Sequence, residues 1–342
     1  MPNSKREKLV QLLDGIGLNR VLALAARRPG LLTLAYHRIG KCADQPFDDE
    51  LFSATAEKFR SQIRYLHDHF ELLSVESLLQ TIERGRLALK RPSVLISFDD
   101  GYRDSFDVAL PILREIGAPA VFFIAAGYVD NPRLTWWDRA AYIVKNTERD
   151  VLELDYPVRL TIDLRKVSRS LATKRILRIY KQKPEIDQEH FFDRLETQAN
   201  VSVDSVALGR DLFVTWDQVR EMKRVGMEIG AHAYDHPVLS RIPEDAQRKE
   251  LAISKERIES EIGGTIRTMA YPVGGPDAFD EVTKRLVQEA GYCAAFSYYG
   301  GFNRSDHAEL FDIRRNSVER HDSFPMFRFR ASTNNLCGRA LL

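Results

Sequence analysis

The chain has 342 residues, of which 44% are hydrophobic and 29% charged, a composition typical of a soluble globular protein with one large domain or two. Its 50 basic and 49 acidic side chains give a formal net charge of +1, which offers no electrostatic reason to expect a nucleic acid as partner. The cysteines, Cys42, Cys293 and Cys337, are odd in number and lack metal-ligand spacing, which favours reduced thiols and a cytoplasmic protein.

The first 30 residues are predicted to form one or two short amphipathic helices. Leu9, Leu12 and Leu13 lie on one side of the first helix, whereas Asp14 and Arg20 interrupt the apolar residues before they reach the length of a signal sequence or a membrane span. The first interpretation is a helix packed on the domain, and the second is weak binding to the membrane surface. We therefore expect a cytoplasmic protein, with peripheral binding at the inner membrane face as an option.

Short apolar runs alternate with amphipathic patterns along much of the chain. The runs typical of strands are 31–37, 94–100, 120–126, 226–232, 268–274 and 292–298. The patterns typical of helices are 57–70, 105–117, 244–264 and 279–291, several of which end in the glycine expected just past a helix. This alternation predicts parallel strands joined by crossover helices, hence an α/β fold with a closed or nearly closed barrel.

The alternation stops between the third and fourth predicted strands, where the sequence is mostly helical in pattern and rich in charge. A compact barrel would join these strands by a short connection, so we expect an inserted helical subdomain in which Trp136 and Trp137 pack. The predicted division is an N-terminal helical segment (1–30), a discontinuous barrel (31–130 and 213–325), a helical insertion (131–212) and a C-terminal tail (326–342).

The stretch "VLISFDDGY" (94–102) places two adjacent carboxylates, Asp99 and Asp100, between a buried strand and a glycine. Successive side chains of a regular strand point to opposite faces, so both carboxylates can line one cavity only if the strand breaks there. The carboxyl ends of strands are where α/β folds keep their chemistry. The alternative interpretation is a turn followed by a helix cap, in which aspartate is common.

The stretch "EIGAHAYDHPVLS" (228–240) follows another strand and carries His232 and His236 four residues apart, a spacing that brings two imidazoles to one side of a turn. Taken alone, such a pair is as compatible with structural histidines as with metal ligands. Together with one carboxylate, the two imidazoles would form a facial triad that leaves positions open on a divalent ion for water and substrate. The second carboxylate would then be free to act as a base.

These motifs resemble those of the polysaccharide deacetylase superfamily, also called NodB-homology or carbohydrate esterase family 4. The resemblance implies a distorted (β/α) barrel that hydrolyses N-acetyl or related acyl groups on sugars. It gives "SFDDGY" a general base, Asp99, and a metal ligand, Asp100, and it makes His232 and His236 the remaining ligands. The chain departs from the family at Ala233, where a serine or threonine usually braces the loop. The ion expected from these ligands is Zn²⁺, and Co²⁺ or Ni²⁺ would also fit.

The stretch "MAYPVGG" (269–275) resembles the third family motif, which gives Tyr271 the role of donating its backbone N–H to the oxyanion. Many members carry an arginine near this position that braces the base, whereas Ala270 stands there in this chain. The candidates that could replace it are Arg267, Arg314 and Arg315.

The fifth motif of the family usually supplies a general-acid histidine on a late strand, but "ELFDIRRNSV" contains none. His321, His307 and His37 are the candidates, and the sequence does not rank them. The stretches "AYHRIG" and "FDIRRNSVERHDS" resemble the branch of the family found with exopolysaccharide synthesis.

Three functions are compatible with the sequence. The first is a metal-dependent hydrolase that removes N-acetyl groups from an amino-sugar-containing glycan or its precursor. The second is a deformylase or deacylase of a lipid-linked or nucleotide-linked sugar, and the third is a sugar-binding module without turnover. The intact set of two aspartates and two histidines favours catalysis on a carbohydrate, with no nucleic acid as partner.

Overall fold

The six apolar runs predicted as strands all form strands in one sheet. The computed structural model describes residues 5–15, 17, 29–42, 45–83, 86–304 and 309–337. In spatial order the strands are β1 (Gly30–Tyr36), β7 (Pro92–Phe98), β8 (Val121–Ile124), β11 (Glu228–Ala231), β12 (Thr268–Ala270) and β13 (Ala294–Ser297). Each pairs in parallel with the next, and nearly every side chain on them is buried, as expected of strands covered on both faces. The predicted α/β class is confirmed.

The sheet curves into a nearly closed barrel because one short segment contacts both of its edges. β15 (Ile313–Arg314) pairs in parallel with β13, and β16 (Asn316–Ser317), one residue further along, pairs in parallel with β1. β14 (Asn303–Arg304) adds an antiparallel bridge to β1. The side chain of Asn316 substitutes for strand backbone, since its amide donates to the carbonyl of Gly301 at 2.8 Å and accepts from the N–H of Gly301 at 3.1 Å.

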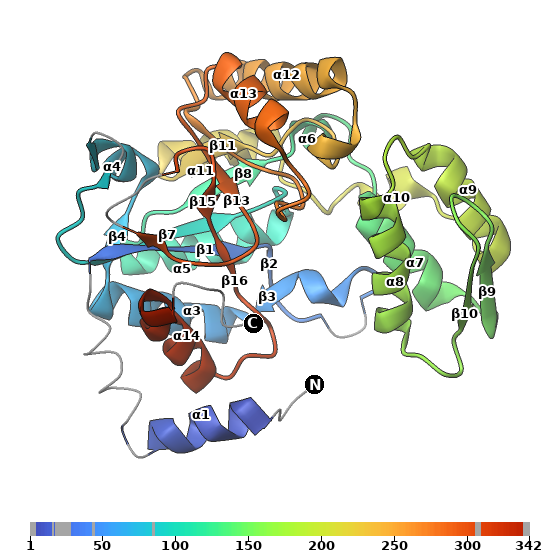
Figure 1. Cartoon of the computed structure of the whole chain (residues 1–342), viewed down its shortest axis with the longest axis horizontal. Coiled ribbons are helices and arrows are strands. Elements are labelled where there is room, and N and C mark those ends of the chain that lie inside the picture. The colour runs from blue at the N-terminus through green and yellow to red at the C-terminus, as the bar shows by residue number, and fades with distance from the viewer. Residues whose placement is uncertain are drawn as a thin grey trace.

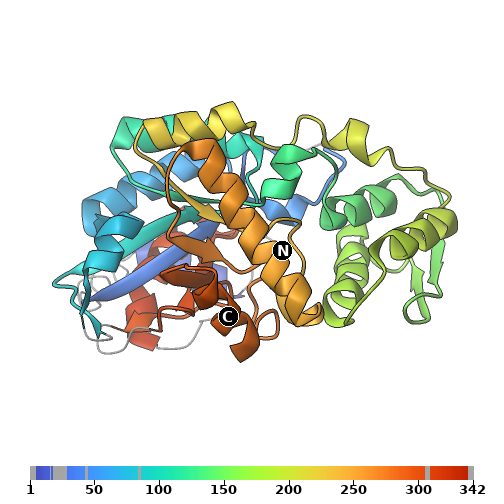
Figure 2. The same ribbon diagram turned by 90° about the horizontal axis from the view of Figure 1, so that it is seen from above.

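The predicted helices form on the outside of the barrel (Figures 1 and 2). They are α3 (Ala56–His69), α5 (Leu110–Ile116), α12 (Glu244–Ile262) and α13 (Glu281–Glu289), and α11 (Trp216–Arg224), which was not predicted, joins them. A π-helical turn over Ser105–Ala109 precedes α5. Side-chain caps begin several of these helices, and α12 ends at Gly263 with φ of 62°, a left-handed conformation in which glycine is favoured.

Shorter elements complete the barrel region. They are β2 (Arg38–Ile39), a 3₁₀ turn (Asp49–Leu51), β3 (Phe52–Ala54), β4 (Glu71–Leu73), α4 (Val75–Gln80), β5 (Ile82–Glu83), β6 (Arg86–Leu87), α6 (Ala126–Asp130) and a 3₁₀ turn (Leu239–Arg241). The core of the barrel includes stacked aromatic rings, and the ring centres of Phe98 and Phe122 lie 4.9 Å apart. Cys42 and Cys293 are free thiols.

The segment 131–212 forms a separate lobe beside the barrel (Figure 1). Its elements are α7 (Trp136–Asn146), the antiparallel pair β9 (Val151–Leu154) and β10 (Leu160–Asp163), α8 (Arg169–Gln182), α9 (Gln188–Ala199) and α10 (Ser205–Gly209). Apolar side chains from α7, α8 and α9 are buried together in a second hydrophobic cluster. The lobe is therefore mostly helical, and the sequence pattern did not predict the β9–β10 hairpin.

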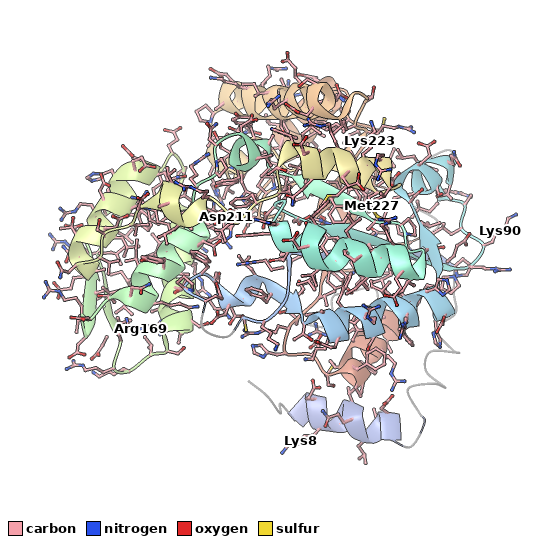
Figure 3. All side chains as sticks on the ribbon, turned by 180° about the vertical axis from the view of Figure 1, so that it is seen from behind. Lys8, Lys90, Arg169, Asp211, Lys223 and Met227 are labelled. Atoms are coloured by element: carbon pink, nitrogen blue, oxygen red, sulfur yellow. The ribbon has the colours of Figure 1, made fainter. Side chains whose placement is uncertain are left out.

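The two ends of the described chain pack together below the barrel. α1 (Lys5–Gly15) lies against α14 (Phe324–Cys337), with Val10 buried and Asp14 paired with Arg328. The opposite side of α1 exposes Leu9 and Leu12, and Lys8 points away from the protein (Figure 3). The rest of the predicted N-terminal helical segment, 18–28, lies outside the described residues. Within the described part of the chain, no helix is both long and apolar enough to cross a bilayer.

The C-terminal boundary needs correction. Residues 326–337 were expected to be a tail, but they form most of α14, which packs on β1 and α3. This segment is helical rather than a tail because Phe327 and Ala331, four residues apart on one side of α14, are buried in the main core.

Candidate active site

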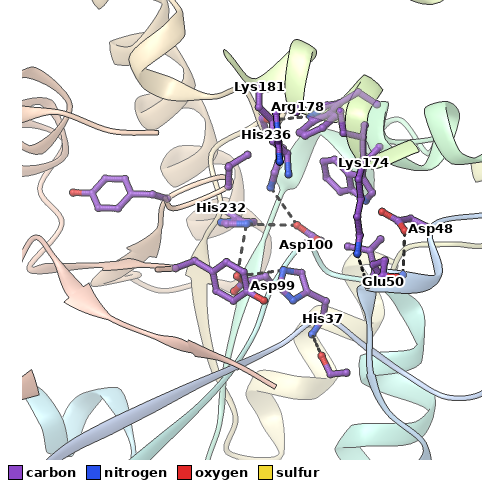
Figure 4. Close-up of a pocket in the computed structure, with 18 of the residues that line it drawn as sticks. His37, Asp48, Glu50, Asp99, Asp100, Lys174, Arg178, Lys181, His232 and His236 are labelled. Carbon is purple, nitrogen blue, oxygen red and sulfur yellow. Dashed lines mark hydrogen bonds and ion pairs between the residues drawn. The ribbon is translucent and has the colours of Figure 1, made fainter. Parts of the chain in front are cut away.

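A pocket opens where the carboxyl ends of the barrel strands meet the helical lobe (Figure 4). His37 follows β1, Asp99 and Asp100 follow β7, His232 follows β11 and Tyr271 follows β12, and all five line the pocket. The parallel strands bring these side chains together from distant parts of the sequence, as in other α/β barrels.

The adjacent carboxylates reach one cavity because the strand breaks between them. The N–H of Asp99 donates to the carbonyl of Tyr36 at 3.0 Å, the last bond between β7 and β1. Asp100 then adopts a left-handed conformation, with φ of 70°, and Gly101 follows with φ of 84°. Such a conformation costs a non-glycine residue about 1–3 kcal/mol and persists only where the surroundings enforce it. The predicted break in the strand is thus confirmed.

Asp100, His232 and His236 form a buried cluster in which one ligand atom from each lies within 4.8 Å of the others. Asp100 Oδ1 lies 3.5 Å from His232 Nε2 and 3.3 Å from His236 Nε2. Asp100 Oδ1 has no hydrogen-bond partner among the described residues. His232 Nδ1 donates to the carbonyl of Ala270 at 2.8 Å, so in the neutral ring the Nε2 lone pair faces Asp100.

The electrostatics of the cluster suit a divalent cation. Burial lowers the pKa of His232 to about 4, so that its imidazole is neutral at pH 7. Burial alone would raise the pKa of Asp100, but the nearby imidazoles, His236 foremost, hold this pKa well below its usual range. Two imidazoles and one carboxylate are a donor set that binds Zn²⁺. Ligand atoms around a tetrahedral Zn²⁺ lie about 3.3 Å apart, which agrees with the two distances from Asp100 Oδ1 to the histidines.

Asp99 is held by Arg315, whose side chain is completely buried. The two guanidinium nitrogens Nη1 and Nη2 donate to the two carboxylate oxygens at 2.5 and 2.8 Å. The remaining donors reach Ser97 Oγ and the carbonyl of Ser297, each at 3.0 Å. Burial alone would raise the pKa of Asp99, but Arg315 and two neighbouring histidines together lower it below its usual range. Asp99 is therefore ionised at neutral pH.

Among the three arginines that could brace the base, the structure brings Arg315 to Asp99. Arg267 pairs with Glu76 at 2.7 Å on the surface, and Arg314 lies over the ring of Tyr299 at 5.2 Å. Arg315 follows β15 in the segment that closes the barrel.

The three candidate acids lie in different places. His37 lines the pocket, with Nε2 3.9 Å from Asp99 Oδ2 and its ring edge-on to Tyr298. His321 forms a hydrogen bond with Arg320 outside the residues that line the pocket. His307 lies in the segment 305–308, outside the described residues.

Tyr271 does not fit the role expected of it. Its backbone N–H donates to the carbonyl of Phe296 at 2.9 Å as part of the pairing between β12 and β13, so this donor is not available to an oxyanion. Its hydroxyl donates to the carbonyl of Phe311, and its ring stacks on Phe279. Two residues later, Val273 lines the pocket with φ of 62°, and its N–H has no partner among the described residues.

The loop that carries both histidines is supported from α12. Glu250 Oε2 accepts the N–H groups of Tyr234 and Asp235, each at 2.9 Å, and Ser254 Oγ donates to the carbonyl of Ala233 at 2.8 Å. These contacts brace a loop in which Ala233 replaces the usual serine or threonine. The sequence reading missed Glu250 because it lies within the pattern of a surface helix, far along the chain from the motif.

The helical lobe contributes a wall of the pocket. Trp136 and Trp137 are buried there as expected, and both also line the pocket. Trp136 Nε1 donates to the carbonyl of His236 at 3.3 Å, and Trp137 Nε1 donates to the hydroxyl of Tyr102 at 2.8 Å. Tyr102 in turn donates to Asp138 at 2.6 Å, so hydrogen bonds join the lobe to both catalytic loops.

Comparison with known families agrees with this geometry. The family model described as polysaccharide deacetylase matches residues 86–295, which include both aspartates and both histidines. The chain belongs to the polysaccharide deacetylase family. This family membership confirms the resemblance seen in the sequence motifs.

The chain is also similar to curated deacetylases over part of its length. It is 29% identical over 112 residues to a poly-beta-1,6-N-acetyl-D-glucosamine N-deacetylase of Staphylococcus epidermidis, over 29% of this chain and 37% of that protein. It is 26% identical over 115 residues to the enzyme with the same name in Escherichia coli K12, over 32% of this chain and 16% of that protein. The matched segments thus span well under two thirds of these relatives.

Solved structures of two family members share the fold. The Streptococcus pyogenes deacetylase PplD in complex with acetate aligns with a TM-score of 0.56 and 18% identity, covering 85% of this chain and 94% of that one. IcaB from Ammonifex degensii aligns with a TM-score of 0.54 and 17% identity, covering 90% and 98%. The predicted distorted (β/α) barrel of this family is confirmed.

Removing the partner of Asp99 is expected to destabilise the barrel. Arg315→Met should lower the free energy of unfolding by about 3–5 kcal/mol at pH 7, because it leaves a buried charge unpaired. Since the folded pKa of Asp99 is depressed, the stability from this pair is present above the unfolded pKa of about 4 and is lost as the pH falls further. Urea unfolding with a chelator present, at several pH values, measures this loss.

Two further variants test the origin of that loss. Adding Asp99→Asn to Arg315→Met should recover part of the stability, because the unpaired charge is removed. Arg267→Met breaks an exposed pair and should cost less than about 1 kcal/mol. Equal losses in Arg315→Met and Arg267→Met would contradict the assignment.

The brace on the histidine loop is expected to tune metal binding. Glu250→Ala should weaken the affinity for Zn²⁺ about 10–100-fold, the range seen when groups behind metal ligands are removed. Competition with a chromophoric chelator measures the dissociation constant. Glu256→Ala removes an exposed carboxylate from the same helix and should leave the affinity unchanged. An unchanged affinity in Glu250→Ala would show that the loop holds its shape without this contact.

Proposed function

We propose that this protein is a metal-dependent hydrolase that removes the N-acetyl group from an amino sugar within a glycan. The observation that carries the proposal is the buried cluster of Asp100, His232 and His236 beside an ionised Asp99, with His37 on the same pocket. The relatives named as poly-beta-1,6-N-acetyl-D-glucosamine N-deacetylases support an N-acetylglucosamine glycan as the first substrate to test.

The cofactor in this proposal is one Zn²⁺ ion held by Asp100, His232 and His236, with Co²⁺ or Ni²⁺ as alternatives for the same ligands. When bound, such an ion polarises the amide carbonyl and lowers the pKa of water, which addresses the low reactivity of an amide toward water. The neutral state of His232 and the ionised state of Asp100 mean that both can ligate the ion at neutral pH.

Asp99 is proposed as the general base. Its carboxylate is ionised and lies next to the cluster, with Oδ2 4.0 Å from His232 Nε2. Arg315 occupies one lone pair on each carboxylate oxygen and fixes the plane of the group, which leaves further lone pairs for the proton of the attacking water. A base that is already oriented needs no rearrangement when the reaction occurs.

His37 is proposed as the general acid that protonates the leaving amine. It lines the pocket and lies near Asp99, so one histidine and one aspartate flank the position of the reacting carbonyl. Val273 is proposed to donate its backbone N–H to the oxyanion, in the place expected of Tyr271, because it faces no competing partner among the described residues.

The other functions considered from the sequence have less support. A sugar-binding module without turnover has no need of an ionised base held by a buried arginine. No contact among the described residues favours a formyl group over an acetyl group. The cytoplasmic or inner-membrane location expected from the sequence stays a prediction, which fractionation of cells containing the tagged protein would test.

Substitution of the proposed base and substitution of a proposed metal ligand are expected to have different effects. Asp99→Asn should retain metal and lose nearly all release of acetate from N-acetylglucosamine oligomers, because an amide cannot accept the proton. His232→Ala should lose both, because one of three protein ligands is gone. Metal content by plasma emission and acetate release measure the two properties. Equal metal content in wild type and His232→Ala would contradict the proposed cluster.

His37, the proposed general acid, is expected to raise kcat only on substrates whose leaving group needs a proton. His37→Gln should lower kcat about 10²–10⁴-fold on an acetylated amino sugar while retaining metal. It should lower kcat far less on 4-nitrophenyl acetate, whose leaving group departs without protonation. His321→Gln is the matched control and should change neither rate. Equal losses on both substrates in His37→Gln would assign the proton transfer to another group.

A further inference from the structure

The helical lobe carries a strongly basic stretch in a chain that is otherwise balanced. Between Asp163 and Glu185 the sequence contains no acidic residue, whereas the whole chain has 50 basic and 49 acidic side chains. The basic residues of this stretch are Arg165, Lys166, Arg169, Lys174, Arg175, Arg178, Lys181 and Lys183. Most of them lie on α8, the helix of the lobe that borders the pocket.

One face of α8 presents three of these cations to the pocket. Lys174, Arg178 and Lys181 follow the spacing of residues on one side of a helix, and all three line the pocket. Figure 4 shows Arg178 and Lys181 beside His236, on the side of the cluster away from Asp99 and His37, whereas Lys174 reaches along one side toward Glu50. Arg175, the next residue after Lys174, is exposed and is not among the residues that line the pocket.

The three cations differ in how they are partnered. Lys174 Nζ pairs with Glu50 Oε2 at 3.0 Å, so its charge is largely neutralised. Arg178 makes no hydrogen bond or ion pair with any residue that the structure describes. Lys181 Nζ lies 5.5 Å from the centre of the Trp136 ring and makes no ion pair with described residues. Two cationic groups thus face the pocket with unused hydrogen-bond donors.

The acidic side chains of the pocket have partners of their own. Glu50 is occupied by Lys174, and Glu319 accepts the hydroxyl of Ser317. Burial raises the pKa of Asp48, whose carboxylate already accepts the N–H of Glu50. Asp99 and Asp100 are committed to the guanidinium of Arg315 and to the metal cluster.

We propose that the α8 face formed by Lys174, Arg178 and Lys181 binds an anionic substituent of the glycan, on a sugar next to the one that is deacetylated. This inference rests on the proposed function and narrows its substrate to an acidic glycan. The fork of Arg178 matches two oxygens of a carboxylate or a phosphate, and Lys181 adds a point charge. Burial lowers the pKa of Lys181, and the nearby carboxylates of Asp48 and Asp100 oppose this effect.

Binding to the metal-loaded full chain tests the inference. Asp99→Asn serves as the background, so that probes bind without turnover. The probes are diacetylchitobiose, which is neutral, a disaccharide of glucuronic acid and N-acetylglucosamine, and N-acetylglucosamine 1-phosphate. We expect one charged probe to bind about tenfold more tightly than the neutral probe, with the advantage decreasing as salt is added. The two charged probes separate a carboxylate from a phosphate as the recognised group.

Matched variants locate the effect. Arg178→Gln and Lys181→Gln should each reduce the preference for the charged probe to near one, while Arg175→Gln should leave it unchanged. Equal affinity for charged and neutral probes, including no binding of any, would overturn the inference, and so would an equal loss in Arg175→Gln. Failure of the wild-type enzyme to release acetate from any glycan would instead contradict the proposed function, because the binding preference does not depend on turnover.

Discussion

The buried ion pair between Arg315 and Asp99 is the interaction on which both the barrel and the site depend. A guanidinium without solvent is tolerable only where it is well partnered, and here each of its three nitrogens donates, to a carboxylate, a hydroxyl or a backbone carbonyl. Because Arg315 lies between β15 and β16, the same contact holds the segment that joins the two edges of the sheet. The group that keeps Asp99 ionised therefore also stabilises the closure of the barrel.

Backbone strain is concentrated around the pocket. Of the six non-glycine residues with positive φ in the described chain, four belong to the loops of the site, namely Asp100, Ala233, His236 and Val273. Asp100, His236 and Val273 bring a carboxylate, an imidazole and an N–H to the pocket, and Ala233 lies in the loop between the two histidines. The surrounding contacts offset this strain, with Glu250 on one loop and the ladder of β12 and β13 on another. Rigid strands and strained loops together produce the geometry of the site.

The sequence predicted what local patterns encode. The main strands followed from apolar runs, and the metal cluster followed from short motifs placed at strand ends. Arg315 could not be distinguished from Arg314, because the sequence does not show where the short strand ends or which of the two adjacent side chains turns inward. The role given to Tyr271 failed because strand pairing consumes its N–H. Glu250 acts through backbone N–H groups, which leave no signal in a motif. What the sequence did not reveal was therefore set by pairing across the sheet.

Arg315 lies near the end of the chain, so it is synthesised long after its partner Asp99. Asp99 and Arg315 are 216 residues apart, so at ribosomal speeds roughly 10–40 s pass between their synthesis. During most of that interval the edge of β1 has no partner from the closing segment, and the edge of β13 joins it once residue 297 has been made. Unpaired strand edges are the kind of surface on which chains associate with one another. Asp99 gains its buried partner only when the closing segment docks, and the same step covers both edges of the sheet.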